Sequence, residues 1–459
     1  MSVNKITEGE VVTLDAILEA RDRRAARIIE LQQALGCCII SFSLNIAGPV
    51  KRAGLTFKTF EAGKREILNQ LIRGSLEILD YIYTDEKTGT EAMWAINADA
   101  HKLKTAMVSI EENHFIGRFF DIDVIDKDGM KISRQAIGQE ERSCFICGEP
   151  GFACARSRAH SLEELTAFTL SLMAGYFENQ HIKAISQCAV KALLYEVCIT
   201  PKPGLVDRVN SGAHNDMDIF TFVDSACSLI NYFEEITRIA IKNRELTPKD
   251  LLGKIRFAGM AAEDNMFEAT KGINTHKGLI FSLGILCAAY GYLYESNSIS
   301  TDKALELCAT IALPALEGDF KNSKTSTTGE ALYVQYKIQG VRGEAASGFN
   351  SVKQFALPVL DNCINAGLSL NDAGAIALLN LIANVEDTNI ISRSSLEAKT
   401  EIQKNMKTLL EQESDAKTLI EKAIQLDSEF IQQNISPGGC ADLLAITLML
   451  YFMNKQGAE

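Results

Sequence analysis

Charged and polar residues gather in short segments that interrupt the apolar second half of the chain. The longest, at residues 196–218, is EVCITPKPGLVDRVNSGAHNDMD and combines Pro and Gly with several carboxylates and cations. Pro and Gly stop a helix, so the polar side chains beside them are expected on a loop, where binding and catalytic groups concentrate. Taken alone, the segment is equally consistent with a solvated surface loop.

Four more segments have the same character: AAEDNMFEATKGINTHKG (261–278), GVRGEAASG (340–348), EDTNIISR (386–393) and NISPGGCADLL (434–444). Their carboxylates suit Mg²⁺, while their Lys, Arg and His side chains and Gly-rich helix starts suit phosphate oxygens. Each segment alone is better explained by an ordinary capped helix end. Together they predict a polyphosphate ligand held by cations and a divalent metal, without a P-loop or a Rossmann glycine motif.

The first half contains a different candidate metal site, in GRFFDIDVIDKDG (117–129). Asp121 and Asp123 are two residues apart on a predicted strand, where side chains at i and i+2 share a face. Both carboxylates can therefore hold one Mg²⁺, as in nucleotidyl-transfer sites where the metal bridges the leaving pyrophosphate. A solvated strand face is the alternative, and Asp126 and Asp128 fit a turn.

A group of potential zinc ligands follows in RSCFICGEPGFACARSRAH (142–160). Cys144, Cys147, Cys154 and His160 have the spacing C-x₂-C-x₆-C-x₅-H, which is typical of a structural Zn²⁺ site. The alternative is a set of ordinary reduced thiols, because twelve cysteines without a signal peptide indicate a reducing compartment.

Short strand-like runs dominate up to about residue 135. They are CCIISFSLNIAG (37–48), MWAINAD (93–99), AMVSIEEN (106–113) and a strand–turn–strand pattern at 118–133. Helical spacing is expected at 14–35 and 60–83, so the first half is predicted to be α+β. From about residue 160 onward, apolar residues recur at helical spacing between Gly, Pro and cap residues, which predicts an all-α second half. We expect two domains, 1–176 and 177–459.

Length and charge exclude several function classes. A chain of 459 residues with 47% hydrophobic and 23% charged residues is a folded protein of more than one domain. Its 46 basic and 59 acidic residues give a net charge of −13, which argues against binding nucleic acid or anionic membranes. The N-terminus has no signal-peptide pattern, and the apolar run 443–453 is far shorter than the roughly 20 residues of a membrane span. We therefore expect a cytoplasmic protein.

The five polar segments occur in the order of the motifs of the triphosphoribosyl-dephospho-CoA synthase family, which the chain resembles from about residue 180 onward. The resemblance implies an enzyme that joins ATP to 3′-dephospho-CoA through a new ribosyl glycosidic bond and releases adenine. Displacing adenine passes through an oxocarbenium-like centre, which favours a nearby carboxylate. A second carboxylate can deprotonate the attacking 2′-hydroxyl.

For these roles and for Mg²⁺, the candidate carboxylates are Asp207, Asp216, Glu263 and Asp264. For phosphates or the departing base, the candidates are Lys202, Arg208, His214, Lys271, His276, Lys277, Arg342 and Arg393. The sequence alone does not divide the roles within these sets.

The first half resembles the holo-citrate lyase synthase family over roughly residues 10–172, through LEARDRRAARIIELQ, ISFSLNIAGPVK, GRFFDIDV and CFICGEPGFACARSRAH. The resemblance implies a nucleotidyltransferase-like enzyme that moves phosphoribosyl-dephospho-CoA onto a serine of the citrate lyase acyl carrier (gamma) subunit and releases pyrophosphate. It places Mg²⁺ on Asp121 and Asp123. It makes Lys51 and Arg118 phosphate candidates, while Arg21, Arg23 and Arg24 either face phosphate or solvate a helix.

The two resemblances name consecutive steps of one pathway, which predicts a bifunctional enzyme of citrate lyase prosthetic-group synthesis. The same chemistry on the carrier protein of malonate decarboxylase is one alternative. The other is that one half is a non-catalytic module that binds the carrier or dephospho-CoA.

Overall fold

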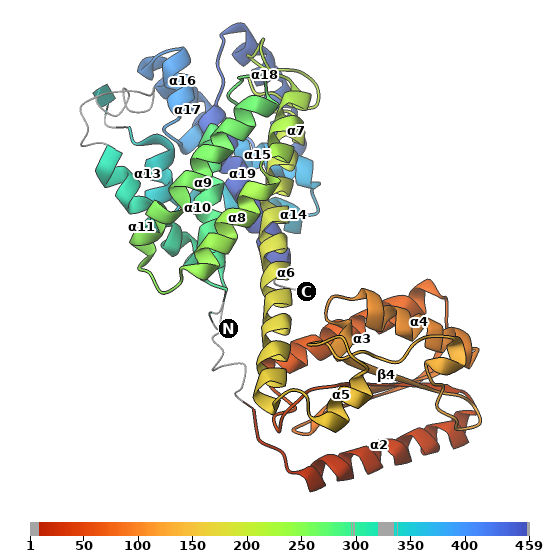
Figure 1. The fold of residues 1–459 in the computed structure, drawn as a ribbon. Coiled ribbons are helices and arrows are strands. Elements are labelled where there is room, and N and C mark those ends of the chain that lie inside the picture. The colour runs from red at the N-terminus through yellow and green to blue at the C-terminus, as the bar shows by residue number, and fades with distance from the viewer. Residues whose placement is uncertain (1–8, 295, 297–298, 320–334, 337, 457–459) are drawn as a thin grey trace. The chain divides into compact units, whose positions relative to one another are not determined.

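The computed structural model describes residues 9–294, 296, 299–319, 335–336 and 338–456 of the 459-residue chain. Its contacts divide the chain into two compact units, Met1–Gln180 and His181–Glu459, called unit 1 and unit 2 below. The division falls inside the long helix α6 (Leu162–Cys198) (Figure 1). No Pro/Gly-rich linker marks it because the helix continues through it.

Before α6, unit 1 contains α2 (Leu14–Leu35), β1 (Cys38–Leu44), α3 (Gly54–Arg73), β2 (Ile78–Glu86), β3 (Gly89–Ile96), α4 (Ala100–Asn113), η1 (Gly117–Phe119), β4 (Phe120–Ile125), η2 (Gln135–Ile137) and α5 (Gly151–Ser157).

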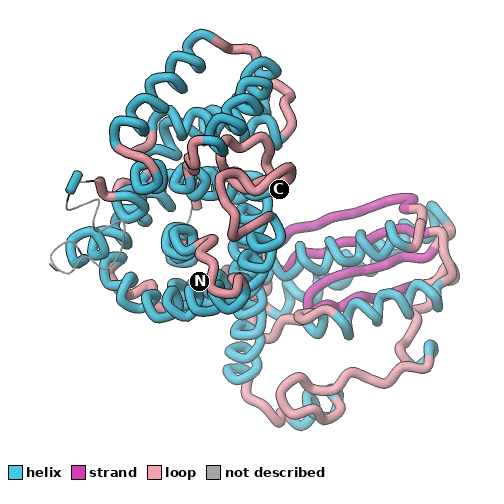
Figure 2. Tube along the Cα trace, turned by 90° about the horizontal axis from the view of Figure 1, so that it is seen from above, coloured by secondary structure: helices cyan, strands magenta, loops and turns pink. Residues whose placement is uncertain are grey.

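The four strands form one antiparallel sheet in the order β2-β3-β1-β4, drawn in magenta in Figure 2. One face carries Phe42, Trp94 and Phe120, which pack in one apolar core with residues of α3 and α4. The opposite face carries Ile39 and Met93, which pack with residues of α2. Alternate residues along each strand point to opposite faces of the sheet, so the strands supply apolar side chains to both faces.

The prediction of a strand at 106–113 is wrong, because these residues form the second half of α4. Asp99 caps this helix by accepting the backbone N–H of Lys102 at 2.9 Å. Leu103 and Met107, one turn apart, are both buried on one face. The helical spacing and the cap therefore outweigh the β-branched residues of the segment.

The helix predicted for 60–83 ends at Arg73, since Ser75 takes a left-handed conformation with φ 49°. Ile78–Glu86 is instead strand β2, which pairs with β3. Of the hairpin predicted at 118–133, only β4 is a strand, because Lys131 makes one isolated bridge to Ile125. The cross-strand partners that decide these segments lie elsewhere in the chain.

Unit 2 continues from α6 with α7 (Ile219–Ser228), α8 (Ile230–Lys242), α9 (Pro248–Ala269), α10 (Lys277–Tyr292), α11 (Thr301–Asp319), α13 (Gly340–Ala346), the π-helical turn η3 (Val352–Ala356), α14 (Leu357–Asn365), α15 (Leu370–Asn384), α16 (Thr388–Arg393), α17 (Leu396–Gln412), α18 (Ala416–Gln432) and α19 (Gly438–Gln456).

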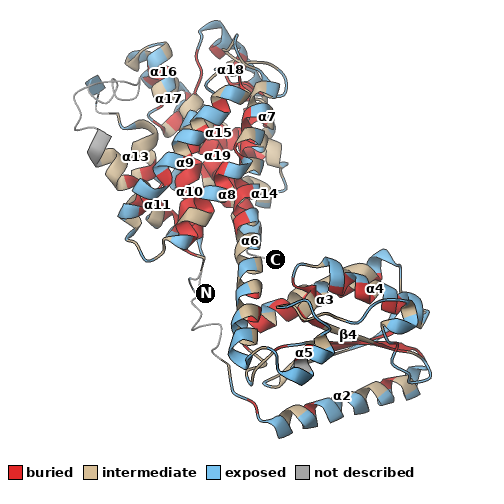
Figure 3. Cartoon of the chain, in the orientation of Figure 1, coloured by how far each residue is buried: buried red, intermediate tan, exposed pale blue. Residues whose placement is uncertain are grey.

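The described residues of unit 2 contain no strand, which confirms the all-α prediction. Helices α10, α15 and α19 form its core and are buried along most of their length (red in Figure 3). Such helices are apolar on all sides because neighbouring helices surround them. The polar segments precede α10, follow α15 and precede α19, so the core helices fix their positions. Among the described residues, no helix is long and apolar enough to cross a membrane.

Candidate active sites

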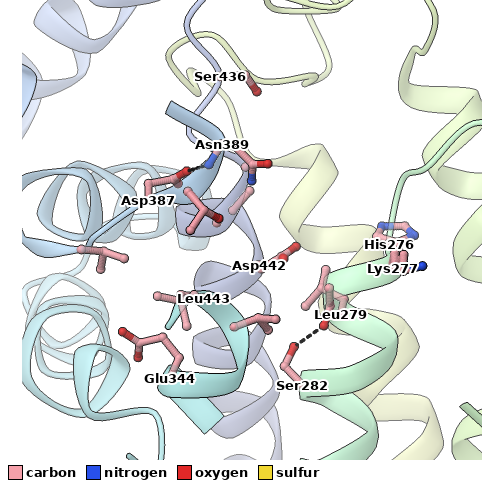
Figure 4. Close-up of a pocket in the computed structure, with 18 of the residues that line it drawn as sticks. His276, Lys277, Leu279, Ser282, Glu344, Asp387, Asn389, Ser436, Asp442 and Leu443 are labelled. Carbon is pink, nitrogen blue, oxygen red and sulfur yellow. Dashed lines mark hydrogen bonds between the residues drawn. The ribbon is translucent and has the colours of Figure 1, made fainter. Parts of the chain in front are cut away.

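Unit 2 contains a cavity of about 1010 Å³ that all five polar segments line. Its walls come from the loop after α6, the start of α10, helix α13, the turn after α15 and the start of α19. Figure 4 shows His276, Asp387 and Asp442 reaching it from three of these elements. The fold thus brings residues from both ends of unit 2 to one ligand-sized space.

Asp207 shapes the loop after α6 and does not line the cavity. Its side chain is buried, and Oδ2 accepts a hydrogen bond from Thr200 Oγ1 at 2.5 Å. Its Oδ1 accepts the backbone N–H groups of Val209 and Asn210 at 2.7 and 3.1 Å. Backbone donors of this kind fix a turn, so the catalytic role expected for Asp207 has no geometric support.

Gly204 fixes the same loop against the end of α18. Its N–H donates to Asp427 Oδ1 at 2.9 Å, and its φ of +71° lies in the left-handed region. A Cβ at this position would lie 2.1 Å from the carbonyl oxygen of Ile435. Glycine is therefore required for both conformation and close approach.

Lys202 and Glu196 form a buried ion pair on the cavity wall. Their Nζ and Oε1 atoms are 2.5 Å apart, and both side chains are almost fully buried. Burial raises the pKa of Glu196, and the charge of Lys202 opposes that shift. A buried pair is stable only while both partners remain, since removing one leaves an uncompensated charge.

His214 joins three segments on the cavity wall. Arg393 Nη2 donates to His214 Nδ1 at 3.3 Å, and Nε2 of the same ring lies 2.9 Å from Ser436 Oγ. Because arginine can only donate, Nδ1 accepts and Nε2 carries the proton that Ser436 receives. Burial and the charge of Arg393 lower the pKa of His214, while Asp216 opposes them. The ring is thus held neutral beside a cation.

Two carboxylates from the far end of the sequence reach into the cavity. Asp442, near the start of α19, lies so close to α10 that a Cβ on Gly278 would be 2.2 Å from its Oδ2. Burial, followed by the charges of Glu196 and Asp387, holds the pKa of Asp442 well above its usual range. Asp387 caps α16 and accepts the backbone N–H of Cys440 at 2.8 Å.

His276 and Lys277 mark the start of α10. His276 is buried, with Nδ1 2.7 Å from Ser225 Oγ, and its Nε2 has no hydrogen-bond partner among the residues that the structure describes. Burial, followed by the charge of Lys202, lowers the pKa of His276 to about 3. Lys277 Nζ lies 2.9 Å from Glu263 Oε2 and lines the cavity as a cation.

The cavity brings together seven of the twelve residues predicted for this half. They are Lys202, His214, Asp216, His276, Lys277, Arg342 and Arg393. The other five, Asp207, Arg208, Glu263, Asp264 and Lys271, do not line it. Arg208 donates to Asn371 Oδ1 at 2.8 Å, while Asp264 and Lys271 are exposed.

In unit 1, Asp121 and Asp123 share one face of β4, opposite Ser43 and Ser41 of β1. Burial and the charge of Asp123 raise the pKa of Asp121. Lys131 Nζ lies 2.7 Å from Asp123 Oδ2 and already supplies one positive charge there. Two neighbouring carboxylates, one of which has a raised pKa, are a suitable site for a divalent cation, because its positive charge stabilises both ionised groups.

Most of the predicted basic residues of unit 1 have protein partners. Lys51 Nζ donates to the carbonyl oxygen of Ile46, and Arg118 Nη2 donates to the Ser143 carbonyl. On α2, Arg23 pairs with Glu86 at 2.7 Å and Arg24 pairs with Glu91 at 3.3 Å, whereas Arg21 is exposed. The pairing of Arg23 and Arg24 with acidic residues of β2 and β3 favours a structural role for both arginines.

The four potential zinc ligands also lie together. The ligand atoms of Cys144, Cys147, Cys154 and His160 are all within 4.8 Å of one another. Residues 142–160 therefore bring the four side chains together as their spacing predicts.

Two family models cover the chain. Residues 182–459, more than half of the chain, match the family of ATP:dephospho-CoA triphosphoribosyl transferases. The chain belongs to this family. Residues 12–176 match the apo-citrate lyase phosphoribosyl-dephospho-CoA transferase family. Both resemblances noted in the sequence are confirmed.

Relatives of full length combine the two matches. Protein CitXG of Haemophilus influenzae is 33% identical over 98% of both chains. Protein CitXG of Leuconostoc mesenteroides is 31% identical over 96% of this chain and 97% of that protein. The 2-(5″-triphosphoribosyl)-3′-dephosphocoenzyme-A synthase of Pectobacterium atrosepticum is 39% identical over 62% of this chain and 94% of its own length.

In this member of the triphosphoribosyl transferase family, five carboxylates that were not selected from the sequence line the cavity, among them Glu386. The others are Glu196, Glu344, Asp387 and Asp442. The sequence pattern around Glu196 and Asp442 could have identified them as candidates. Each is the only acidic residue within an apolar helical run, LLYEVC and CADLLAITL respectively. A buried acid on such a face requires a partner or a function.

Proposed function

We propose that the chain is a bifunctional transferase of citrate lyase prosthetic-group biosynthesis, with one reaction in each unit. Unit 2 makes 2′-(5″-triphosphoribosyl)-3′-dephospho-CoA from ATP and 3′-dephospho-CoA and releases adenine. Unit 1 transfers phosphoribosyl-dephospho-CoA from this product to a serine of the citrate lyase acyl carrier subunit and releases pyrophosphate. The two matched families support both reactions, and the product of the first is the substrate of the second.

The observation that carries the proposal is the cavity of unit 2, in which cations and carboxylates come from all five motif segments. Lys202, Lys277, Arg342 and Arg393 supply positive charge for a triphosphate. The paired glycines at the start of α19 add backbone N–H groups at a helix N-terminus. Neutral His214, hydrogen-bonded to Ser436, is suited to a hydroxyl or to the leaving base.

We assign Asp442 as the base of the first reaction. The 2′-oxygen of dephospho-CoA bonds to C1′ of the ATP ribose, while the bond from C1′ to adenine breaks and its electrons leave with adenine, which takes up one proton from solvent. The proton of the 2′-hydroxyl passes to the Asp442 carboxylate, and the raised pKa of Asp442 makes this carboxylate a stronger base than an ordinary aspartate. Asp216 lines the same cavity, with its side chain 64% exposed. Its carboxylate is available to stabilise the oxocarbenium-like centre.

In unit 1, Asp121 and Asp123 fit a bound Mg²⁺, because both carboxylates point from one face of β4. Bound there, Mg²⁺ neutralises charge on the leaving pyrophosphate. Two protein ligands leave positions for substrate phosphates, which is the arrangement expected of a nucleotidyltransferase-like site. The four-residue Cys/His cluster is a candidate for Zn²⁺, which neither reaction requires.

The proposal places the enzyme in the cytoplasm. All twelve cysteines are free thiols in the structure, which fits a reducing compartment.

One assay tests both reactions. The full chain is incubated with ATP, Mg²⁺ and 3′-dephospho-CoA, and adenine is quantified before apo carrier subunit is added. We expect adenine release followed by a phosphoribosyl-dephospho-CoA mass increase on the carrier. Adenine without the adduct would refute the assignment of unit 1, and a folded chain that releases no adenine would refute that of unit 2. The apo carrier of malonate decarboxylase, assayed in parallel, should gain little mass.

A further inference from the structure

The residues Cys144, Cys147, Cys154 and His160, called the Cys/His cluster below, take no part in either proposed reaction. Their ligand atoms all lie within 4.8 Å of one another, and the sulfur atoms of Cys147 and Cys154 are 4.0 Å apart. In a tetrahedral site with Zn–S bonds of about 2.3 Å, neighbouring sulfur atoms are about 3.8 Å apart. Small side-chain movements therefore bring the cluster to zinc geometry.

The backbone holds the first two ligands in a tight turn. The N–H of Gly148 donates to the Cys144 carbonyl at 2.9 Å, and the N–H of Cys144 donates to the Glu149 carbonyl at 2.6 Å. Gly148, with φ +77°, supplies the left-handed residue that this turn needs directly after Cys147. The turn is therefore built by the backbone, and it holds the two cysteines close together without any bond between their sulfur atoms.

A metal explains the cluster better than thiols alone. All three cysteines are free thiols, and Nε2 of His160 is buried with no hydrogen-bond partner in the described part of the chain. A buried polar atom without a partner costs free energy, which a bond to a metal would recover. A disulfide between Cys147 and Cys154 would not explain why Cys144 and His160 lie beside them.

The residues just before the cluster contact η1 and the first residue of strand β4 in the same unit. Arg142 Nη2 donates to the Phe120 carbonyl at 2.8 Å, and Ser143 Oγ accepts from Arg118 Nη2 at 3.2 Å. A metal that fixes residues 144–160 therefore fixes these contacts as well. We propose that the Cys/His cluster binds one structural zinc ion, which holds the segment 142–160 against the start of β4.

The test measures metal in the full chain purified without chelator. Elemental analysis should find about one zinc per chain, as for other four-ligand structural sites. Cys147→Ser should lower the zinc content at least about tenfold, because a three-ligand site binds far more weakly. The matched control is Cys227→Ser, since Cys227 is exposed on α7 and outside the cluster. Replacing zinc by Co²⁺ should give a thiolate-to-metal absorption band that Cys147→Ser weakens.

Three outcomes would overturn the proposal. They are less than about a tenth of an equivalent of zinc in folded parent protein, full zinc retention in Cys147→Ser, and a Cys147–Cys154 disulfide detected by mass in unreduced protein. If Cys147→Ser does not fold, a chelator can strip the parent and added Zn²⁺ can be titrated back. Failure to rebind one equivalent would overturn it equally. None of these readouts depends on adenine release or carrier modification.

Discussion

Asp387 and Asp442, both on the cavity wall, differ in their surroundings. Three backbone N–H groups hold the carboxylate of Asp387, whereas no described residue donates a hydrogen bond to the carboxylate of Asp442. The raised pKa of Asp442 means that the folded protein binds this proton more tightly than the unfolded chain does. Above the ordinary pKa of an aspartate, the ionised carboxylate therefore costs the fold stability, and this cost grows until the pH passes the raised pKa.

We predict that Asp442→Asn lowers the rate of adenine release at least about 100-fold, the usual effect of losing a general base. The melting temperature at pH 7 should not fall, because asparagine removes a charge that the fold disfavours. Adenine release and calorimetry on the full chain measure the two effects. Asp224→Asn, at an exposed position of α7 outside the cavity, is the control. Near-normal turnover in Asp442→Asn would show that Asp442 is not the general base.

His276 should make unit 2 sensitive to acid. Its folded pKa of about 3 lies below the usual value of about 6.5. As the pH falls below 6.5, the unfolded chain takes up a proton that the folded chain refuses until about pH 3, so stability is lost across that window. At pH 5 the loss is up to about 2 kcal/mol.

His276→Gln should therefore show a smaller drop in melting temperature between pH 7 and pH 5 than the parent. His101→Gln, at an exposed position on α4, should show the same drop as the parent. An unchanged drop in His276→Gln would mean that other groups set the acid sensitivity.

At the scale of elements, the ends of α10, α15 and α19 position the cavity, and the loop after α6 closes against α18 at Gly204. We predict that Gly204→Ala destabilises the protein by about 1–3 kcal/mol or more, because its left-handed backbone and the contact with Ile435 both exclude a side chain. Adenine release should fall as the loop shifts. Urea unfolding measures the loss.

The control for this change is Gly253→Ala. Gly253 lies in helix α9, has no positive φ, and a Cβ there meets no atom within 4 Å. Alanine should be neutral or stabilising by up to about 1 kcal/mol at such a site. Equal losses in both variants would show that the loop does not need glycine at residue 204.

The sequence predicted helices and polar segments well, and failed where distant partners decide. The helix at 14–35 is α2 with the same bounds, because its cap residues and its pattern are local. By contrast, Ile78–Glu86 has a helix-compatible pattern and becomes a strand only by pairing with β3. The site follows the same rule: loop cations such as Lys277 were predicted, whereas Asp442 becomes a site residue only because α19 packs beside α10.

At the scale of the whole molecule, two reactions share one chain, and the intermediate must leave one site before it enters the other. Fusion raises the local concentration of that intermediate around unit 1. Variants that disable one unit each therefore separate transfer within a chain from transfer between chains.

We predict that Asp123→Asn still releases adenine but does not modify the carrier, because it removes a Mg²⁺ ligand from unit 1 only. Asp442→Asn should release almost no adenine, but it should modify the carrier when it is given purified triphosphoribosyl precursor. A mixture of the two variants with ATP and 3′-dephospho-CoA should restore carrier modification, which mass spectrometry of the carrier measures. No modification in the mixture, with each single assay as expected, would show that the intermediate does not pass between chains.

The position of Asp442 on α19 has a consequence for synthesis of the protein on the ribosome. Every strand of the unit 1 sheet lies between Cys38 and Ile125, so this sheet can pair while the rest of the chain is still being translated. The unit 2 cavity needs α19, which follows all its other walls in the chain. The carrier-modifying unit is thus able to fold before the unit that supplies its substrate can become active.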